Sequence, residues 1–199
     1  MSRRHPHSRA AVTALVLTAA IGLGLAACAA RSGSLQTLGE QLAPASSSGG
    51  NSARSPEDGY IPDDASVSPF DDTLPAIAKL KPKLRAAIQA AATDAQAEGV
   101  EMVVDSGWRS RRLQQALLDA ATIEYGSLEE ARKWVNTPEL STHVTGNAVD
   151  IGYTDADSWL SQHGARYGLC QIYSNEIWHF ELATTPGGEC PIQRTDAAG

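Results

Sequence analysis

Hydrophobic residues recur at helical spacing in the stretch that follows Pro82. They stand three or four positions apart from Leu84 to Ala95, and the pattern stops at Gly99, a residue suited to ending a helix in a left-handed conformation. The spacing therefore predicts a helix over residues 82–98. Similar patterns predict further helices over residues 111–125, 127–135 and 155–166. In the helix over 127–135, Ser127 is the expected N-cap, and Glu130 would complete a capping box.

Short runs rich in β-branched and apolar residues lie between and after these helices. They predict strands over residues 100–106, 147–152, 169–173 and 177–182. Ser174, Asn175 and Glu176 join the last two runs, which indicates a β-hairpin. Helices and strands in irregular order, without regular βαβ alternation, favour the α+β class. We expect a single small domain with a mainly antiparallel sheet flanked by helices.

The N-terminal segment has the organisation of a secretory signal. A basic stretch precedes an apolar run over residues 10–27, and two alanines stand directly before Cys28. Small residues before a cysteine resemble a bacterial lipobox, so we expect residues 1–27 to be removed and Cys28 to carry a lipid. The alternatives are an ordinary secretory signal with an incidental cysteine, or an uncleaved membrane helix at the short end of the spanning range.

Residues 28–59 are rich in Ser, Gly, Ala and Pro and have too little apolar surface to offset the entropy of ordering them. We interpret this segment as a flexible linker between the lipid on Cys28 and a folded domain over residues 60–199. The expected location is the cell envelope, with the protein anchored as a lipoprotein on the outer face of the cytoplasmic membrane. We expect a monomer.

Composition supports one folded domain with an acidic surface. The chain has 199 residues, 42% of them apolar, and a formal net charge of −7, which argues against a disordered chain and against a nucleic-acid partner. Export also affects the cysteines, because thiols outside the cytoplasm can be oxidised. We predict a disulfide between Cys170 and Cys190, with two free thiols or a metal-binding pair as the alternatives.

The candidate chemistry lies in two polar segments beside predicted strands. His143 precedes Asp150 by seven positions, with a turn at Gly146 between them, and His179 follows Glu176 by three. Two neutral imidazoles and one carboxylate are a common ligand set for catalytic zinc, which keeps one position open for water and requires a nearby base. Glu176 is suitably placed for that base. Taken singly, each of these residues has a plainer explanation as a loop, cap, hairpin or strand residue.

Together, the segments resemble the zinc D-alanyl-D-alanine carboxypeptidases of the VanY type and their relatives, the VanX-type dipeptidases. Ser-x-His-x-x-Gly-x-Ala-x-Asp begins at Ser141, and Glu-x-Trp-His ends at His179. A third segment, Ser-Gly-Trp-Arg-Ser around Arg109, is followed by Gln114 and is similar to the family's Ser-Gly-Tyr-Arg-Ser stretch. Trp108 replaces the tyrosine of that stretch. The resemblance extends over about residues 103–182.

The resemblance implies a role for each matching residue. His143, Asp150 and His179 would bind Zn²⁺ at the sheet, Glu176 would be the catalytic base, and Arg109 would be the cation that stabilises the oxyanion. Ser141 and Gln114 also match, and would hydrogen-bond the substrate or position the ligand loop. Trp178 would line the substrate cleft or fill the core.

The implied function is removal of the terminal D-alanine from peptidoglycan stem peptides by metal-activated water. The same chemistry could act on another bond, as in an L,D-carboxypeptidase, a dipeptidase or an L-Ala/D-Glu endopeptidase. Outside this enzyme class, the chain could be a non-catalytic peptidoglycan-binding lipoprotein or a structural protein of the envelope whose histidines are unconnected.

Overall fold

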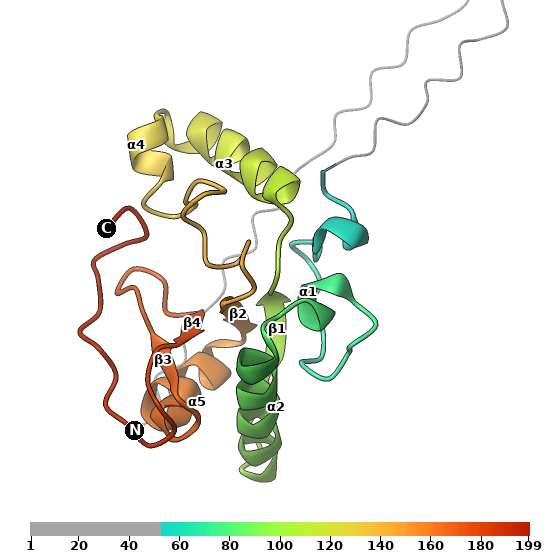
Figure 1. Cartoon of the computed structure of the whole chain (residues 1–199), viewed down its shortest axis with the longest axis vertical. Coiled ribbons are helices and arrows are strands. Elements are labelled where there is room, and N and C mark those ends of the chain that lie inside the picture. Colours follow the sequence, from blue (N-terminus) through green and yellow to red (C-terminus); the bar gives the residue numbers. More distant parts are fainter. Residues whose placement is uncertain (1–52) are drawn as a thin grey trace, which may run out of the picture. The chain divides into compact units, whose positions relative to one another are not determined.

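The computed structural model describes residues 53–199 (Figure 1). The predicted signal segment, Cys28 and most of the predicted linker lie outside these described residues. Within the described part, no helix has both the length and the apolar character needed to cross a bilayer.

A four-stranded sheet lies at the centre of the described chain. Its strands are β1 (Val103–Ser106), β2 (Ala148–Gly152), β3 (Leu169–Gln171) and β4 (His179–Leu182), in the order β1-β2-β4-β3. Every neighbouring pair is antiparallel. The predicted α+β class with an antiparallel sheet is confirmed.

The predicted hairpin of β3 and β4 is present, but β4 begins at His179 and the connection is longer than expected. The backbone before Glu176 pairs elsewhere: Arg194 N donates to Ile172 O at 2.9 Å, and Ser174 N donates to Arg194 O at 2.9 Å. Because the backbone of residues 172 and 174 pairs with Arg194 in the C-terminal segment, residues 172–178 form a loop and do not pair with each other as the ends of two strands.

Helices α2 (Pro82–Ala97) and α5 (Thr154–His163) cover one face of the sheet. Helices α3 (Arg111–Tyr125) and α4 (Leu128–Ala131) lie together at the opposite end of the described domain (Figure 1). Three shorter elements complete the list: η1 (Pro56–Asp58), α1 (Pro75–Ala78) and η2 (Gly164–Tyr167).

Two helices differ in length from the prediction, each for a local reason. Ser127 caps α4 as expected, because its Oγ accepts a hydrogen bond from Glu130 N at 3.1 Å. The Glu130 carboxylate instead binds Lys133 Nζ at 2.8 Å, so the capping box is only half formed. The α-helical part is one turn long, and residues 132–134 continue it as hydrogen-bonded turns. Helix α5 stops at His163 because the chain tightens into η2.

Alternation along β2 and β4 separates an apolar face of the sheet from a polar one. Val149, Ile151 and Phe180 belong to the main hydrophobic core, which α2 and α5 complete, and all are at most 1% exposed. Asp150 and His179 alternate with these residues and therefore point to the opposite face. They are also register partners in the β2–β4 pair, which places the two side chains next to each other.

Ordered structure begins before Tyr60, the predicted start of the domain. Asp58 is only 7% exposed, and its carboxylate accepts hydrogen bonds from Ser110 Oγ at 2.6 Å and from the guanidinium of Arg112. These contacts connect η1 to the first turn of α3, so Asp58 lies in the folded domain although the prediction placed it in the linker.

The predicted disulfide between Cys170 and Cys190 is present and joins β3 to the C-terminal segment.

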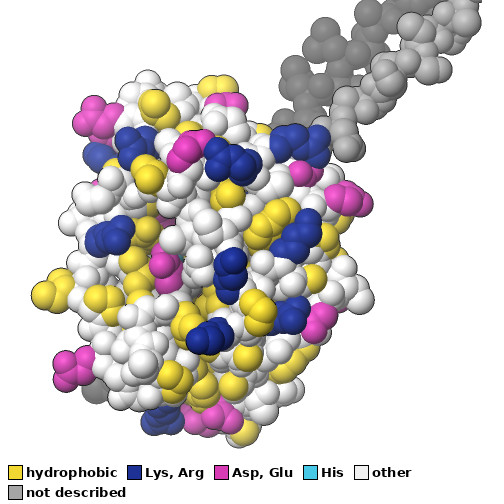
Figure 2. Space-filling view, in the orientation of Figure 1, with side chains coloured by type: hydrophobic (Ala, Val, Ile, Leu, Met, Phe, Trp, Pro, Cys, Tyr) yellow, Lys and Arg dark blue, Asp and Glu magenta, His cyan; other side chains and the backbone are white. Residues whose placement is uncertain are grey.

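On the face shown in Figure 2, Lys and Arg side chains lie singly among hydrophobic and acidic side chains.

Candidate metal centre

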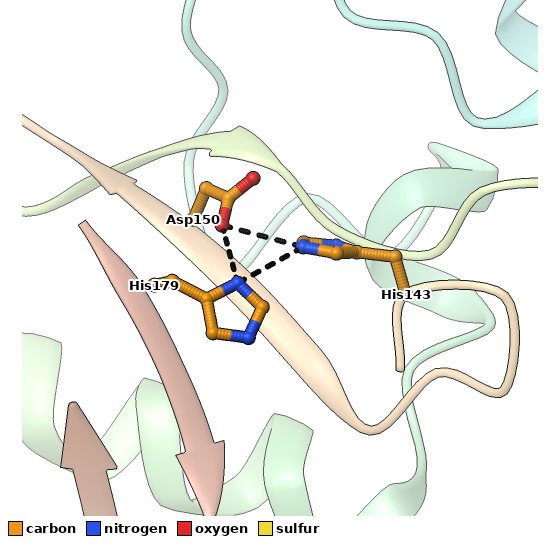
Figure 3. Close-up of side chains that lie close together, drawn as sticks. All are labelled: His143, Asp150 and His179. Atoms are coloured by element: carbon orange, nitrogen blue, oxygen red, sulfur yellow. Dashed lines mark hydrogen bonds and ion pairs between the residues drawn. The ribbon is translucent and has the colours of Figure 1, made fainter. Parts of the chain in front are cut away.

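Three side chains converge on the polar face of the sheet. Asp150 comes from β2, His179 from β4 and His143 from the loop before β2, and all three point toward one another (Figure 3). Asp150 Oδ1 lies 3.0 Å from His179 Nδ1 and 3.3 Å from His143 Nε2. The two imidazole nitrogens are 3.3 Å apart. The three residues predicted as metal ligands are therefore brought together, each at most 7% exposed.

Contacts on the far side of each imidazole fix which nitrogen carries a proton. His143 Nδ1 lies 2.8 Å from the carbonyl oxygen of Gly107, which can only accept, so His143 donates there. His179 Nε2 lies 3.1 Å from Glu181 Oε1, and the pKa of Glu181 is held below its ordinary value although burial opposes this. In their neutral forms, both histidines would therefore turn an unprotonated nitrogen toward Asp150, the arrangement of a metal ligand oriented by a second hydrogen bond.

This arrangement of donors fits a metal ion. Two imidazole lone pairs and a carboxylate oxygen that face one another require a cation between them. A tetrahedral zinc ion with bonds of about 2.0–2.1 Å holds its ligand atoms about 3.4 Å apart. The observed separations of 3.0 to 3.3 Å are close to that value. Burial lowers the pKa of His179, but hydrogen bonds to Asp150 and Glu181 outweigh burial and raise the pKa to about 9. When no metal is bound, a proton on His179 therefore supplies the positive charge between these groups.

Two glycines allow the loop of His143 to reach the sheet. Gly146 has a φ of 73°, a conformation that side chains rarely adopt, and its N–H closes the turn on the His143 carbonyl at 3.0 Å. Gly107 approaches the backbone of α1 so closely that a Cβ would lie 2.2 Å from the carbonyl oxygen of Ala76. Any larger residue at position 107 would move the carbonyl that orients His143.

Arg109 lies beside Asp150 and lines the same cleft as the cluster. Its Nη2 donates to Asp150 Oδ2 at 2.8 Å, its Nε donates to Ser106 Oγ at 2.7 Å, and its Nη1 donates to Gln114 Oε1 at 3.2 Å. Burial alone would raise the pKa of Asp150, but His143, His179 and Arg109 together hold this pKa well below its ordinary value. Asp150 is therefore ionised and ready to bind a cation.

Glu176 approaches the cluster from the loop before β4. Its Oε2 lies 3.7 Å from His179 Nδ1, and its Oε1 is buried without a hydrogen-bond partner among the described residues. Burial, followed by the negative charge of Asp150, raises the pKa of Glu176 to about 7. A carboxyl group with this pKa can accept and return a proton near neutral pH.

The other predicted site residues all line the cleft, and Gln114 is the most deeply buried of them. Ser141 and Trp178 line the same cleft as the cluster, and Trp178 is 37% exposed, so the alternative that it fills the core is wrong. Gln114 is 1% exposed, accepts from Arg109 and donates from its Nε2 to Asn136 O at 2.8 Å. Both ends of the Gln114 amide are thus bound by the protein, which favours positioning over substrate binding.

The sequence analysis missed three groups that contact the imidazoles. Glu181 stands two positions after His179, and strand alternation puts both on one face, so this partner could have been found from the pattern. The carbonyl of Gly107 and the buried ring of Tyr173, whose centroid lies 4.9 Å from that of His179, have no comparable signal.

Two imidazoles and one carboxylate on an antiparallel sheet, with a buried glutamate beside them, are the features of a mononuclear metallohydrolase. The chain belongs to the VanY family: the model of this family, described as D-alanyl-D-alanine carboxypeptidase, matches residues 77–184. That range contains the whole cluster, Glu176 and Arg109.

Known relatives carry related descriptions. A D-alanyl-D-alanine carboxypeptidase from Enterococcus faecalis (strain ATCC 700802 / V583) is 32% identical, and the match covers 43% of this chain and 41% of the relative. The chain thus spans about two-fifths of the length of this curated relative.

Two solved structures are similar to the described domain. The vancomycin resistance D,D-dipeptidase VanXYg, in complex with a D-Ala-D-Ala phosphinate analogue, matches with a TM-score of 0.50 and 25% identity over 65% of this chain and 61% of that chain. A mutant of the vancomycin resistance D,D-pentapeptidase VanY, in complex with Zn(II), matches with a TM-score of 0.49 and 26% identity over 55% of this chain and 73% of that chain.

Proposed function

We propose that this protein is a zinc-dependent carboxypeptidase that removes the terminal D-alanine from peptidoglycan stem peptides. The observation that carries the proposal is the buried triangle of His143, Asp150 and His179 with Glu176 at its edge, in a chain of the VanY family. The relatives named above, one described as a D-alanyl-D-alanine carboxypeptidase and another as bound to a D-Ala-D-Ala analogue, support the choice of substrate.

The residues around the cluster divide the chemistry between them. Zinc, when bound, lowers the pKa of a water molecule to about 7 and polarises the substrate carbonyl. Glu176 takes a proton from the attacking water at its unpartnered Oε1 and returns it to the leaving amine. Its pKa of about 7 suits both transfers.

Arg109 faces the charge that develops on the carbonyl oxygen. A guanidinium has five N–H groups, and Arg109 uses one on each of its three nitrogens to contact Ser106, Gln114 and Asp150. The two remaining N–H groups belong to a residue that lines the cleft, so they can donate to the oxyanion. An interaction of this kind contributes about 3 to 4 kcal/mol to transition-state stabilisation.

A pentapeptide that ends in D-Ala-D-Ala tests the proposal directly. The purified protein loaded with zinc should release D-alanine, and a chelator should stop the release. Glu176→Gln should keep one zinc per chain but reduce turnover about 10²- to 10⁴-fold. Glu189→Gln, the same change at an exposed glutamate, should leave turnover unchanged. Full turnover by Glu176→Gln, or no D-alanine release by the zinc-loaded wild type, would refute the proposal.

We further propose that the protein is exported and anchored by a lipid on Cys28. The sequence before Cys28 and the disulfide in the described domain both support an address outside the cytoplasm. In cells, the wild type should be labelled by a radioactive fatty acid and shortened at its N-terminus, and Cys28→Ala should abolish both the labelling and the shortening. Labelling that survives this substitution would contradict a lipid on Cys28.

A further inference from the structure

Two exposed aromatic side chains lie in the cleft beyond the metal ligands. Tyr125 is the last residue of α3 and Trp134 follows α4, and their rings stack with centroids 6.1 Å apart and planes within 14°. Their exposed fractions are 41% and 40%. Both residues line the cleft that also contains His143 and Glu176. An exposed aromatic surface continuous with a reaction site marks a place where a ligand binds.

Helix α3 borders the cleft from the neighbourhood of Arg109 to Tyr125. Gln114, in its first turn, hydrogen-bonds Arg109 beside Asp150, and Tyr125 lies eleven positions later. At 1.5 Å per residue the two positions are about 16 Å apart along the helix. Leu117 and Ala121 line the cleft between them, so the same face of α3 borders it throughout. Figure 1 shows α3 running toward α4.

That distance corresponds to the peptide part of the substrate in the proposed function. An extended chain spans about 3.3–3.6 Å per residue, so about 16 Å holds four to five residues. A pentapeptide that follows α3, with the bond before its last residue at the metal ligands, would place its N-terminal end near Tyr125, on which Trp134 stacks. In peptidoglycan this end is attached to an N-acetylated amino sugar.

The chemistry of the pair suits a sugar better than the end of the peptide. One face of a pyranose ring consists of C–H groups, which pack on the electron-rich face of an aromatic ring. The residues at the start of the stem peptide are small or acidic and offer no comparable apolar face. Glu124 lines the cleft next to Tyr125 and supplies an acceptor for sugar hydroxyls.

We propose that Tyr125 and Trp134 form a sugar subsite that binds the amino sugar carrying the stem peptide. The proposal rests on the proposed function, because it takes the cleaved bond to lie at the metal ligands. It makes the sugar-bearing muropeptide, and not the free peptide, the preferred substrate.

The test compares a muramyl pentapeptide with the same pentapeptide without its sugar. The wild type should have the higher kcat/KM on the muramyl substrate, and Trp134→Ala should reduce that value about two- to tenfold, while kcat/KM on the free peptide stays the same. Trp134→Phe should retain most of the preference. Phe70→Ala removes an aromatic side chain that is 51% exposed and lies outside this cleft, and it should change neither value.

Binding measurements separate this proposal from the proposed function. In the Glu176→Gln background, calorimetry should give tighter binding of the muramyl pentapeptide than of the free peptide, and Trp134→Ala should remove the difference. If this pattern appears but the wild type hydrolyses neither substrate, the proposed function fails and the sugar subsite stands. Equal weakening of both ligands by Trp134→Ala would overturn the subsite, because the pair would then contact the peptide. No effect on either ligand would overturn it as well.

Discussion

Removal of the disulfide should lower the stability of the domain by an amount that the length of its loop determines. The perturbation is the double substitution Cys170→Ala and Cys190→Ala. Alanine is chosen because Cys170 is 1% exposed and a serine hydroxyl would be buried there. The cysteines are separated by 20 positions. The loop-closure entropy restored to the unfolded chain then corresponds to about 3 kcal/mol.

Thermal unfolding is the measurement. For a domain of this size, about 3 kcal/mol lowers Tm by roughly 6–12 °C. Circular dichroism on the zinc-saturated wild type and double variant gives the difference, and the wild type treated with a reductant should approach the variant. A shift below about 2 °C would refute the entropic argument, because the disulfide would then restrict the conformational entropy of the unfolded chain only slightly.

The same variant should also loosen the C-terminal segment locally. Residues after Cys190 pair with the loop before Glu176, through Arg194 N to Ile172 O and Ser174 N to Arg194 O, both at 2.9 Å. Without the disulfide, these amides should exchange with solvent faster than they do in the wild type, while the amides of β2 should change little. Equal protection of the Ser174 amide in both proteins would show that the segment holds its place unaided.

Three further perturbations test other parts of the structure. Chelation should lower Tm. At zinc concentrations about 1,000 times Kd, bound zinc stabilises the wild type by about 4 kcal/mol, and the variant His143→Ala should lack most of this zinc-dependent stabilisation. Gln114→Ala should lower kcat about tenfold with little change in zinc content, because Arg109 loses an acceptor 3.2 Å away; unchanged kcat would argue against positioning. The hydrogen bond from Arg112 lowers the pKa of Asp58 from 3.8 to about 2, so the stability contributed by its carboxylate is complete above pH 3.8 and decreases as pH falls toward 2. Urea titrations should show that Asp58→Asn lessens this decrease, and an identical decrease in both proteins would contradict it.

Prediction from the sequence succeeded where the determinants are local. The bounds of α3 were predicted correctly, and the structure shows a local determinant in the same short segment: Ser110 caps the helix by accepting a hydrogen bond from Leu113 N at 3.0 Å. The ligand cluster was predicted because its motifs resemble those of the VanY-type enzymes, and the sheet register then explains why Asp150 and His179 meet.

Prediction failed where a partner lies far along the chain. Asp58 was assigned to the linker because its partner Arg112 is 54 positions away, and no periodic pattern connects them. The loop over residues 172–178 was predicted as strand ends for the same reason, since the chain that takes its hydrogen bonds lies near Arg194. Hydrophobic periodicity reports which face is buried, but it does not report which distant segment covers it.

The metal ligands are held in place in two different ways, which should respond differently to loss of the metal. Asp150 and His179 alternate with Val149 and Phe180, so the register that buries the core also sets the distance between these two ligands. A shift of one residue would turn both ligands into the core, and the unfavourable burial of their polar groups opposes it. His143 depends instead on a glycine-dependent turn and one carbonyl contact. Removal of the metal should therefore increase exchange in the turn around His143 first, while the amides of β2 and β4 stay protected until the whole domain unfolds.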